Sequence, residues 1–222
     1  MTQIKAVIFD MDGLMLNTEP IYYRANQKTA DYLGMNFSFD IYSQFIGMGD
    51  ADYKKTMGKL YKDEEDLNTF FEKSKIVLEY LLMNDEVEIK EGLIELLDYL
   101  KNNGIMTIVA SSSNRYIIDH LLQRLDLQKY FNAVVGGDEV SFGKPNPAIF
   151  DKAFEKTGLS DKKQALILED SKNGVEAAVA ASIPVIMIPD LIKPDKDLER
   201  KVLSVLPSLW ELIPYLEQRN RE

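Results

Sequence analysis

Ala6-Val7-Ile8-Phe9-Asp10-Met11-Asp12-Gly13 is an apolar run that ends in two aspartates. Ala6–Phe9 is continuously apolar, which is typical of a strand that is covered on both faces of a sheet. Asp10 and Asp12 are two positions apart, so in extended backbone their side chains share one face. Two carboxylates in so small a volume repel each other unless a proton or a cation intervenes, and Mg²⁺ prefers oxygen ligands. The stretch therefore predicts a strand with an acidic, ligand-binding end, although a turn with two ordinary aspartates explains this pair equally well on its own.

Short apolar runs alternate with amphipathic stretches through most of the remaining sequence. The runs that predict further strands are Met106–Ala110, Ala133–Val135, Ala165–Leu168 and Val185–Ile188. The stretches that predict helices between them are Gly92–Asn102, Arg115–Leu125, Pro147–Thr157 and Lys172–Ala181. This alternation is typical of the α/β class, and it predicts a Rossmann-like parallel sheet flanked by helices.

The segment between Glu19 and Asp85 breaks this alternation, because it carries helical patterns and no convincing strand. An inserted all-α domain explains it better than one very long crossover. We expect this domain at residues 17–86, inserted into a Rossmann-like core made of residues 1–16 and 87–222. Met83–Glu86 is the expected return hinge. Residues 190–197 are expected to form a loop before a short closing helix at residues 209–217.

Composition and charge limit the possible partners. The chain has 222 residues, 45% of them hydrophobic, so it can bury a sizeable core and does not resemble a disordered segment. Its formal net charge of −10 at pH 7, without a basic cluster, argues against nucleic acid as a partner. No run approaches the roughly 20 apolar residues of a membrane span, and no secretory signal is visible. We therefore expect a cytoplasmic protein, monomeric or weakly dimeric, with no membrane partner.

The two scarcest residue types restrict the chemistry. Cysteine is absent and histidine occurs once, at His120. A thiolate nucleophile is thus excluded, and a Ser–His–Asp triad is disfavoured because it needs an imidazole base. Ile117, Leu121 and Leu125 form an apolar stripe at helical spacing, which predicts that His120 lies toward solvent. Any catalysis has to use carboxylates, hydroxyls, lysines and metal.

Three other polar segments follow or adjoin predicted strands. Ser111-Ser112-Ser113-Asn114 comes directly before a predicted helix, where hydroxyls and free N–H groups form an anion pocket. Lys144 lies in the stiff loop Gly143-Lys144-Pro145-Asn146-Pro147, which suits a lysine that neutralises phosphate. Glu169-Asp170 ends the fourth strand with a second acidic pair. A serine N-cap and a solvated helix start are the ordinary explanations of the first and third segments, but the whole set is hard to ascribe to chance.

The set Asp10-Met11-Asp12-Gly13, Ser111, Lys144 and Glu169-Asp170 resembles the four motifs of the haloacid dehalogenase superfamily. The similar branch contains phosphatases and sugar phosphomutases with a helical cap domain inserted after the first motif. Residues 14–20 extend the resemblance into the start of the cap, and the likeness spans the whole chain. Haloalkanoate dehalogenases of this superfamily lack the second aspartate of the first motif, so Asp12 favours phosphoryl transfer.

The resemblance implies a role for each motif residue. Asp10 would be the nucleophile that forms an aspartyl-phosphate, and Asp12 would act as general acid and then general base. The implied Mg²⁺ ligands are the carboxylates of Asp10 and Asp170, the main-chain carbonyl of Asp12, and Glu169 as a ligand or support. The implied phosphate-binding groups are the Ser111 hydroxyl, the Ser112 N–H and the Lys144 ammonium, with Ser111 and Lys144 counted as catalytic. The substrate would be a small phosphorylated metabolite, such as a sugar phosphate.

Hydrolase and mutase remain alternatives within this branch. Beta-phosphoglucomutases carry a histidine in the first cap helix and an arginine after a cap glycine. This chain has Tyr22 at the first position and the acidic segment Gly47–Asp52 at the second. Without basic residues there, binding of a second phosphate is disfavoured, which favours a phosphatase. The residues expected to set specificity are Glu19, Tyr22, Asn114 and Arg115, and Arg115 could hold a second anionic group. A non-catalytic binding module is a third, more remote alternative.

Overall fold

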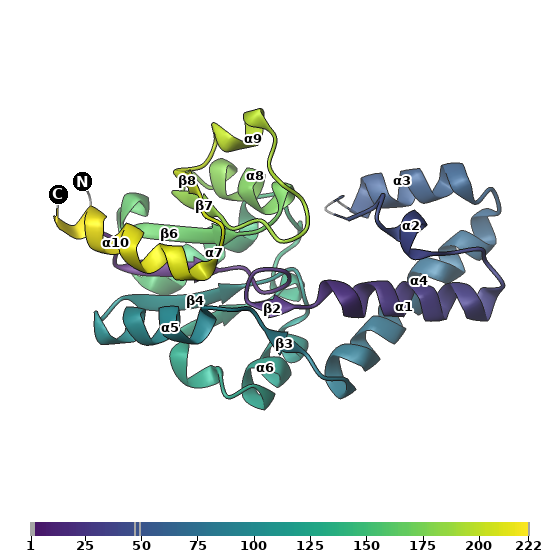
Figure 1. Ribbon diagram of the computed structural model, residues 1–222, viewed down its shortest axis with the longest axis horizontal. Coiled ribbons are helices and arrows are strands. Elements are labelled where there is room, and N and C mark those ends of the chain that lie inside the picture. The colour runs from purple at the N-terminus through teal and green to yellow at the C-terminus, as the bar shows by residue number, and fades with distance from the viewer. Residues whose placement is uncertain (1–2, 47, 49, 222) are drawn as a thin grey trace. The chain divides into compact units, whose positions relative to one another are not determined.

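The computed structural model describes residues 3–46, 48 and 50–221, in which the chain divides into two compact units (Figure 1). One unit comprises Met1–Asn17 and Glu88–Glu222, and the other comprises Thr18–Val87. Each observed boundary lies one residue from the boundary expected from the sequence. The helical segment is therefore an insertion between two parts of one larger unit.

The larger unit is built on a six-stranded sheet in the order β5-β4-β1-β6-β7-β8. Every neighbouring pair is parallel, so the carboxyl ends of all six strands lie at one edge. The strands are β1 (Ala6–Phe9), β4 (Met106–Ala110), β5 (Ala133–Val135), β6 (Ala165–Glu169), β7 (Val185–Met187) and β8 (Ser204–Val205). The predicted α/β class with a parallel sheet is confirmed. β8 was not predicted from the sequence, because two residues are too few to show a period.

Helices cover both faces of this sheet (Figure 1). The α-helices of this unit are α5 (Leu93–Asn102), α6 (Arg115–Arg124), α7 (Ala148–Thr157), α8 (Lys172–Ala180), α9 (Lys196–Glu199) and α10 (Leu212–Arg221). Single 3₁₀ turns occur at η1 (Gln128–Tyr130), η2 (Gly137–Glu139), η3 (Lys162–Gln164) and η4 (Leu209–Glu211). The expected loop over residues 190–197 is wrong at its end, because α9 begins at Lys196. Asp195 caps that helix by accepting a hydrogen bond from the Leu198 N–H at 2.8 Å.

The central strand β1 is buried on both sides, as its continuous apolar sequence predicts. Ala6 and Ile8 belong to a cluster formed with buried side chains of α7 and α8, whereas Val7 and Phe9 point to the opposite face. On α8 the buried side is made of small residues, including Ala177 and Ala178, which allow close packing on the sheet. A rigid β1 fixes the position of the residues that follow it.

A second sheet has two strands, one directly before the inserted unit in the sequence and one directly after it. It pairs β2 (Leu16–Asn17) with β3 (Glu88–Ile89) in antiparallel register. The Asn17 side-chain amide donates a hydrogen bond to the Glu88 carboxylate at 3.0 Å. The sequence analysis predicted neither strand, since each has only two residues.

The helical unit contains α1 (Glu19–Leu33), α2 (Phe39–Tyr42), α3 (Asp50–Leu60) and α4 (Glu64–Asn84). Its core is a largely aromatic cluster around Phe37, Tyr42, Phe45 and Phe70, with Tyr22 and Tyr23 packed against it. The expected hinge at Met83–Glu86 is wrong in its first half, because α4 continues through Asn84, and Leu81 and Leu82 in its last turn are buried. In the part of the chain that the structure describes, no helix is both long enough and apolar enough to cross a bilayer.

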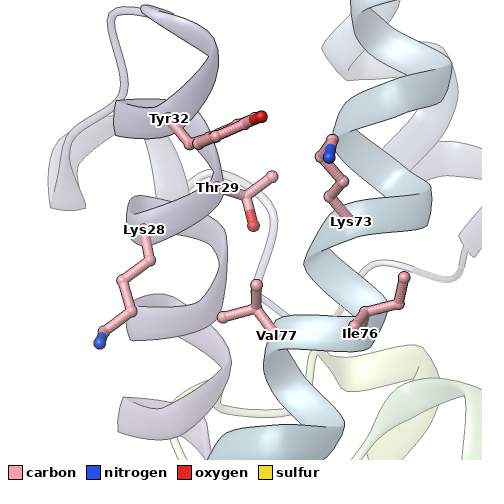
Figure 2. A pocket seen from close by; sticks show the side chains of 6 residues that line it. All are labelled: Lys28, Thr29, Tyr32, Lys73, Ile76 and Val77. Carbon is pink, nitrogen blue, oxygen red and sulfur yellow. The ribbon is translucent and has the colours of Figure 1, made fainter.

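A groove of about 350 Å³ runs between α1 and α4 in the helical unit (Figure 2). It is lined by Lys28, Thr29, Tyr32, Lys73, Ile76 and Val77. The Lys73 ammonium lies 4.8 Å from the centre of the Tyr32 ring, a cation–π contact. None of the six lining residues is acidic, so this groove does not offer the carboxylate chemistry expected from the sequence.

Candidate active site

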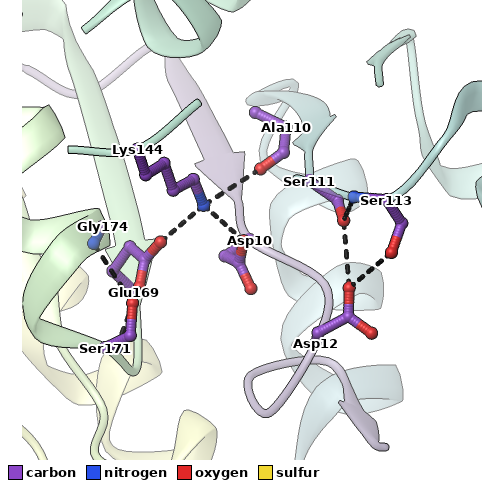
Figure 3. A network of polar contacts seen from close by, with 9 residues as sticks. All are labelled: Asp10, Asp12, Ala110, Ser111, Ser113, Lys144, Glu169, Ser171 and Gly174. Carbon is purple, nitrogen blue, oxygen red and sulfur yellow. Dashed lines mark hydrogen bonds and ion pairs between the residues drawn. The ribbon is translucent and has the colours of Figure 1, made fainter. Parts of the chain in front are cut away.

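Five of the sequence-predicted site residues gather at the carboxyl edge of the larger unit's sheet: Asp10, Asp12, Ser111, Lys144 and Glu169 (Figure 3). Asp10 follows β1, Ser111 follows β4, and Glu169 is the last residue of β6. In the register of the sheet Phe9 pairs with Val109 on one side and with Leu168 on the other, so these three strand ends are neighbours. Ligands of open α/β sheets bind at this edge.

Lys144 reaches into this edge from the loop before α7. Its ammonium lies 2.5 Å from Asp10 Oδ1 and 2.6 Å from Glu169 Oε1, and 3.5 Å from the carbonyl oxygen of Ala110. The side chain is 7% exposed, and its ammonium lies 4.8 Å from the centre of the Phe150 ring. Burial restricts the Lys144 side chain to one position, in which its ammonium lies between two carboxylates.

Two serines hold the side chain of Asp12. The hydroxyls of Ser111 and Ser113 donate hydrogen bonds to Asp12 Oδ2 at 3.1 and 3.0 Å, and the Ser113 N–H donates to the Ser111 hydroxyl at 3.0 Å. Ser112 between them is exposed. Ser113 was not among the site residues predicted from the sequence, although its two-residue spacing from Ser111 indicates a shared face.

The acidic pair at the end of β6 is divided between two environments. Glu169 is fully buried and accepts hydrogen bonds at 2.9 Å from both the N–H and the hydroxyl of Ser171. The Ser171 hydroxyl accepts in turn from the Gly174 N–H at 3.1 Å, which caps α8. Asp170 is half-buried, and one oxygen each of Asp10, Glu169 and Asp170 lie within 4.8 Å of one another. Ser171 and Gly174 are supporting residues that the sequence analysis did not identify.

The electrostatics of this cluster are unfavourable to three negative charges. Burial raises the pKa of Asp10 to about 8, with Glu169 and Asp12 adding to the effect and Lys144 opposing it. Burial and the charges of Glu169 and Asp10 raise the pKa of Asp170 well above its ordinary value. Burial disfavours the charged form of Lys144, but Asp10 and Glu169 outweigh this and hold its pKa above the ordinary value. The ammonium is therefore charged, and it offsets part of the negative charge of the carboxylates around it.

A divalent cation fits this donor set. Three carboxylate oxygens converge around one point, and hard cations such as Mg²⁺ bind such oxygens. A cation there would favour the ionised carboxylates and so remove the conflict that raises the pKa values of Asp10 and Asp170. Oδ2 of Asp12 is held by the two serines instead, and the ligand predicted from Asp12 is its main-chain carbonyl.

The four residues expected to set specificity lie in two places. Glu19 belongs to the helical unit, where its carboxylate accepts a hydrogen bond from the Tyr42 hydroxyl, and Tyr22 packs on the core of that unit. Asn114 is the N-cap of α6 and is half-buried. Gly47 and Gly49 of the predicted acidic segment lie outside the described residues. The proposed contacts of these residues with substrate stay predictions.

Arg115, at the start of α6, is engaged in contacts within its own unit. Its guanidinium lies 2.9 Å from Asp119 and 3.4 Å from Glu139, and it donates to the Val134 carbonyl at 3.1 Å. Two carboxylates already neutralise this guanidinium, so a second phosphate would have to compete with them for its positive charge. This arrangement makes Arg115 a poor anchor for a bisphosphate. His120, also on α6, is half-buried rather than plainly exposed.

We expect Gly174→Ala to lower the free energy of unfolding by about 3 kcal/mol or more. A Cβ at Gly174 would lie 1.7 Å from Glu169 Oε1, so the buried carboxylate would have to leave both Lys144 and Ser171. Urea denaturation measures the loss. Gly58→Ala in α3 is the matched control, because no atom lies within 4 Å of its Cβ position, and it should raise stability by about 0.5–1 kcal/mol. A loss below about 1 kcal/mol for Gly174→Ala would show that Glu169 tolerates displacement.

Comparison with known proteins adds to this geometry. The family model described as haloacid dehalogenase-like hydrolase matches residues 7–188. The chain is 33% identical over 184 residues to a phosphorylated carbohydrates phosphatase of Thermotoga maritima, covering 81% of this chain and 82% of that protein. It is 32% identical over 188 residues to a probable pseudouridine-5'-phosphatase of Drosophila melanogaster, covering 82% and 80%.

A solved structure matches both units. It is the crystal structure of a "putative beta-phosphoglucomutase" from Thermotoga maritima, with a TM-score of 0.77 and 27% identity, covering 97% of this chain and 99% of that one. The family match includes the strand that leads to Asp10, the Lys144 loop and the acidic end of β6. On this evidence of sequence and fold together, the chain belongs to the haloacid dehalogenase-like hydrolases.

Proposed function

We propose that this chain is a Mg²⁺-dependent phosphomonoester hydrolase that acts on a small phosphorylated metabolite through an aspartyl-phosphate on Asp10. The observation that carries the proposal is the buried contact of Lys144 with both Asp10 and Glu169 at the carboxyl edge of the sheet. A sugar phosphate or a similar polar monoester is the proposed substrate class. The two relatives are named as a phosphorylated carbohydrates phosphatase and a probable pseudouridine-5'-phosphatase, and these names support that class.

Asp10 is the proposed nucleophile. One of its carboxylate oxygens forms a bond to phosphorus while the bond from phosphorus to the ester oxygen breaks. Lys144 holds the other oxygen of Asp10 and adds a positive charge beside the transferring group. Splitting the reaction into two displacements is the advantage of covalent catalysis, and Asp10 becomes free again when water attacks the phosphorus of the intermediate.

Asp12 is the proposed acid and base of the two steps. It gives a proton to the departing ester oxygen, and it then takes a proton from the water that hydrolyses the aspartyl-phosphate. The hydroxyls of Ser111 and Ser113 hold its carboxylate in one orientation. An anionic phosphoryl group nearby favours the protonated form of Asp12, because like charges disfavour a second negative charge. Such acid–base help contributes roughly 10²–10⁴ in rate.

Phosphate and metal binding are divided among the other site residues. The proposed Mg²⁺ ligands are the carboxylates of Asp10, Glu169 and Asp170 and the main-chain carbonyl of Asp12. When bound, Mg²⁺ would neutralise negative charge on the phosphoryl oxygens, which phosphoryl transfer requires. The proposed phosphate-binding groups are Lys144, the Ser111 hydroxyl and the Ser112 N–H. The Ser111 hydroxyl has to turn from Asp12 toward the phosphate to fill this role.

The helical unit is the proposed cap that selects the leaving group. Lids of this kind exclude water and complete the site around the substrate. Glu19 and Tyr22 on α1, with Asn114 and Arg115 at the start of α6, are the proposed specificity residues. A cytoplasmic location and a monomeric or weakly dimeric state stay predictions from the sequence.

A sugar phosphomutase is the second candidate function. The likeness to the Thermotoga maritima structure described above favours it. A mutase has to hold the distal phosphate of a bisphosphate, and Arg115 is already shared between Asp119 and Glu139. The hydrolase is therefore the better supported of the two.

Phosphate release from a panel of phosphomonoesters tests the proposal. The panel is assayed with Mg²⁺ and with a chelator, beside a coupled assay for conversion of glucose 1-phosphate into glucose 6-phosphate with a bisphosphate primer. We expect release that depends on Mg²⁺ and no isomerisation. Primer-dependent isomerisation without net phosphate release would show that the chain is a mutase and not a hydrolase. If neither activity were found across the panel, the non-catalytic binding module would be the remaining alternative.

A further inference from the structure

We propose that Asp190 is an outer carboxylate of the metal site, and that its negative charge strengthens Mg²⁺ binding while Lys90 serves as its counter-ion. This inference rests on the proposed function, because it presumes that Asp10, Glu169 and Asp170 hold the cation. Neither residue belongs to the motifs found in the sequence. From the sequence, Asp190 was predicted only to be the first residue of a loop.

The sheet brings Asp190 to the edge that carries the acidic cluster. It lies in the segment that follows β7, the strand next to β6. The Ile188 N–H donates a hydrogen bond to the Glu169 carbonyl at 2.8 Å, which fixes this segment against the end of β6. The side chain of Asp190 is only 11% exposed. An aspartate is rarely buried to that extent without a partner.

Lys90 is that partner, and it is itself anchored near the first motif. Its ammonium lies 2.6 Å from Asp190 Oδ1, with 29% of its side chain exposed. Its N–H donates to the Met15 carbonyl at 2.8 Å, within the segment that follows Asp12 and Gly13. The ion pair thus joins the loop after β7 to the residue that follows β3, and the backbone of that residue is hydrogen-bonded to the segment after β1.

Gly13 reveals how close Asp190 is to the metal site. A Cβ at Gly13 would lie 2.4 Å from Asp170 Oδ2 and 3.4 Å from Asp190 Oδ2. The two oxygens therefore approach the same point of backbone, and only glycine leaves room for them there. Gly13 also has a φ of +84°, which glycine adopts without strain. Asp190 thus offers one oxygen to Lys90 and the other to the space beside Asp170.

The charges of the pair predict opposite effects for its two members. Removing the charge of Asp190 leaves Lys90 as an extra positive charge near the cation, so Mg²⁺ should bind more weakly. Removing the charge of Lys90 leaves Asp190 as an extra negative charge, so Mg²⁺ should bind at least as tightly as in the wild type. A pair that only braced the two loops would give losses of the same sign.

Titration calorimetry with MgCl₂ on the full chain tests the inference without reference to activity. We expect Asp190→Asn to weaken Mg²⁺ binding about tenfold or more, in the range of other outer residues of metal sites. Lys90→Met should bind as tightly as the wild type or more tightly. Asp151→Asn is the control and should leave binding unchanged, because it breaks an ion pair of similar length, 2.7 Å to Lys162, that is more exposed and joins α7 to η3.

Two results would overturn the inference. If Asp190→Asn and Lys90→Met weakened Mg²⁺ binding equally, the pair would serve only to hold the two loops together. If Asp190→Asn bound Mg²⁺ as tightly as the wild type, Asp190 would have no role at the metal. Melting temperatures are measured on every variant, and Asp190→Ser replaces Asp190→Asn if the latter is unstable. Asp170→Asn separates this inference from the proposed function. If Asp170→Asn lost Mg²⁺ binding while Asp190→Asn bound Mg²⁺ like the wild type, only the inference about Asp190 would be overturned. If the wild type itself did not bind Mg²⁺, the inference and the proposed function would both be overturned.

Discussion

Asp10→Asn should hydrolyse phosphomonoesters about 10⁴-fold more slowly than the wild type, or worse, because an amide cannot form the covalent intermediate. The chain should still fold, since asparagine has the same shape and Lys144 keeps its contact with Glu169 at 2.6 Å. Phosphate release under saturating substrate measures the activity, and thermal unfolding checks the fold. Asp151→Asn, on the outer side of α7, should keep wild-type activity. Turnover by Asp10→Asn near the wild-type rate would remove the nucleophile assignment.

Asp12→Ala is the companion to this experiment, because it removes the proposed acid and leaves the nucleophile. Sugar phosphates should lose roughly 10²–10⁴ in rate, since their alkoxide leaving groups need a proton. An activated aryl phosphate should lose much less in the first step, because its leaving group departs without one. Single-turnover measurements isolate that step. Equal losses for the two substrates would contradict the acid role of Asp12.

Lys144→Met should lower the free energy of unfolding by about 3–5 kcal/mol when no Mg²⁺ is present. The substitution removes the cation that Asp10 and Glu169 share in a buried site and leaves both carboxylates unpaired. Added Mg²⁺ should stabilise this variant more than it stabilises the wild type, because a ligand that binds the folded state raises stability in proportion to its affinity. Urea denaturation with and without Mg²⁺ measures both effects.

Lys162→Met is the matched control for Lys144→Met. Lys162 pairs with Asp151 at 2.7 Å, but both side chains are about 40% exposed, at 38% and 41%. A pair so open to water should contribute less than about 1 kcal/mol. A similar loss in both variants would show that burial gives Lys144 no special weight. A Lys144→Met variant as stable as the wild type without Mg²⁺ would show that the carboxylates do not need its charge.

The parts of the fold that could be predicted have long, uniform patterns. β1, β4, β5 and β6 were predicted to within a residue, because strands covered on both faces are continuously apolar. The strands β2, β3 and β8 were not found, since two residues show no period and their pairing partners lie elsewhere in the chain. The same limit applies to the short helix α9.

The motif residues could be selected for a related reason. In a parallel sheet the residue after each strand lies at one edge, so Asp10, Ser111 and Glu169 could be grouped from strand order alone. The stiff loop around Lys144 suggested a fixed lysine. Its contacts, at 2.5 Å to Asp10 and 2.6 Å to Glu169, could not be predicted from the sequence, because they depend on how α7 packs.

The class of fold, the presence of an inserted helical segment and the residue types available for chemistry follow from the amino-acid sequence alone, because they depend on local pattern and composition. The tertiary structure decided which of these groups touch. Ser113 reaches Asp12 across 101 positions of sequence, and Lys90 reaches Asp190 across 100. No local pattern records such pairs, since their energies come from burial and from charges that meet only when the sheet has formed.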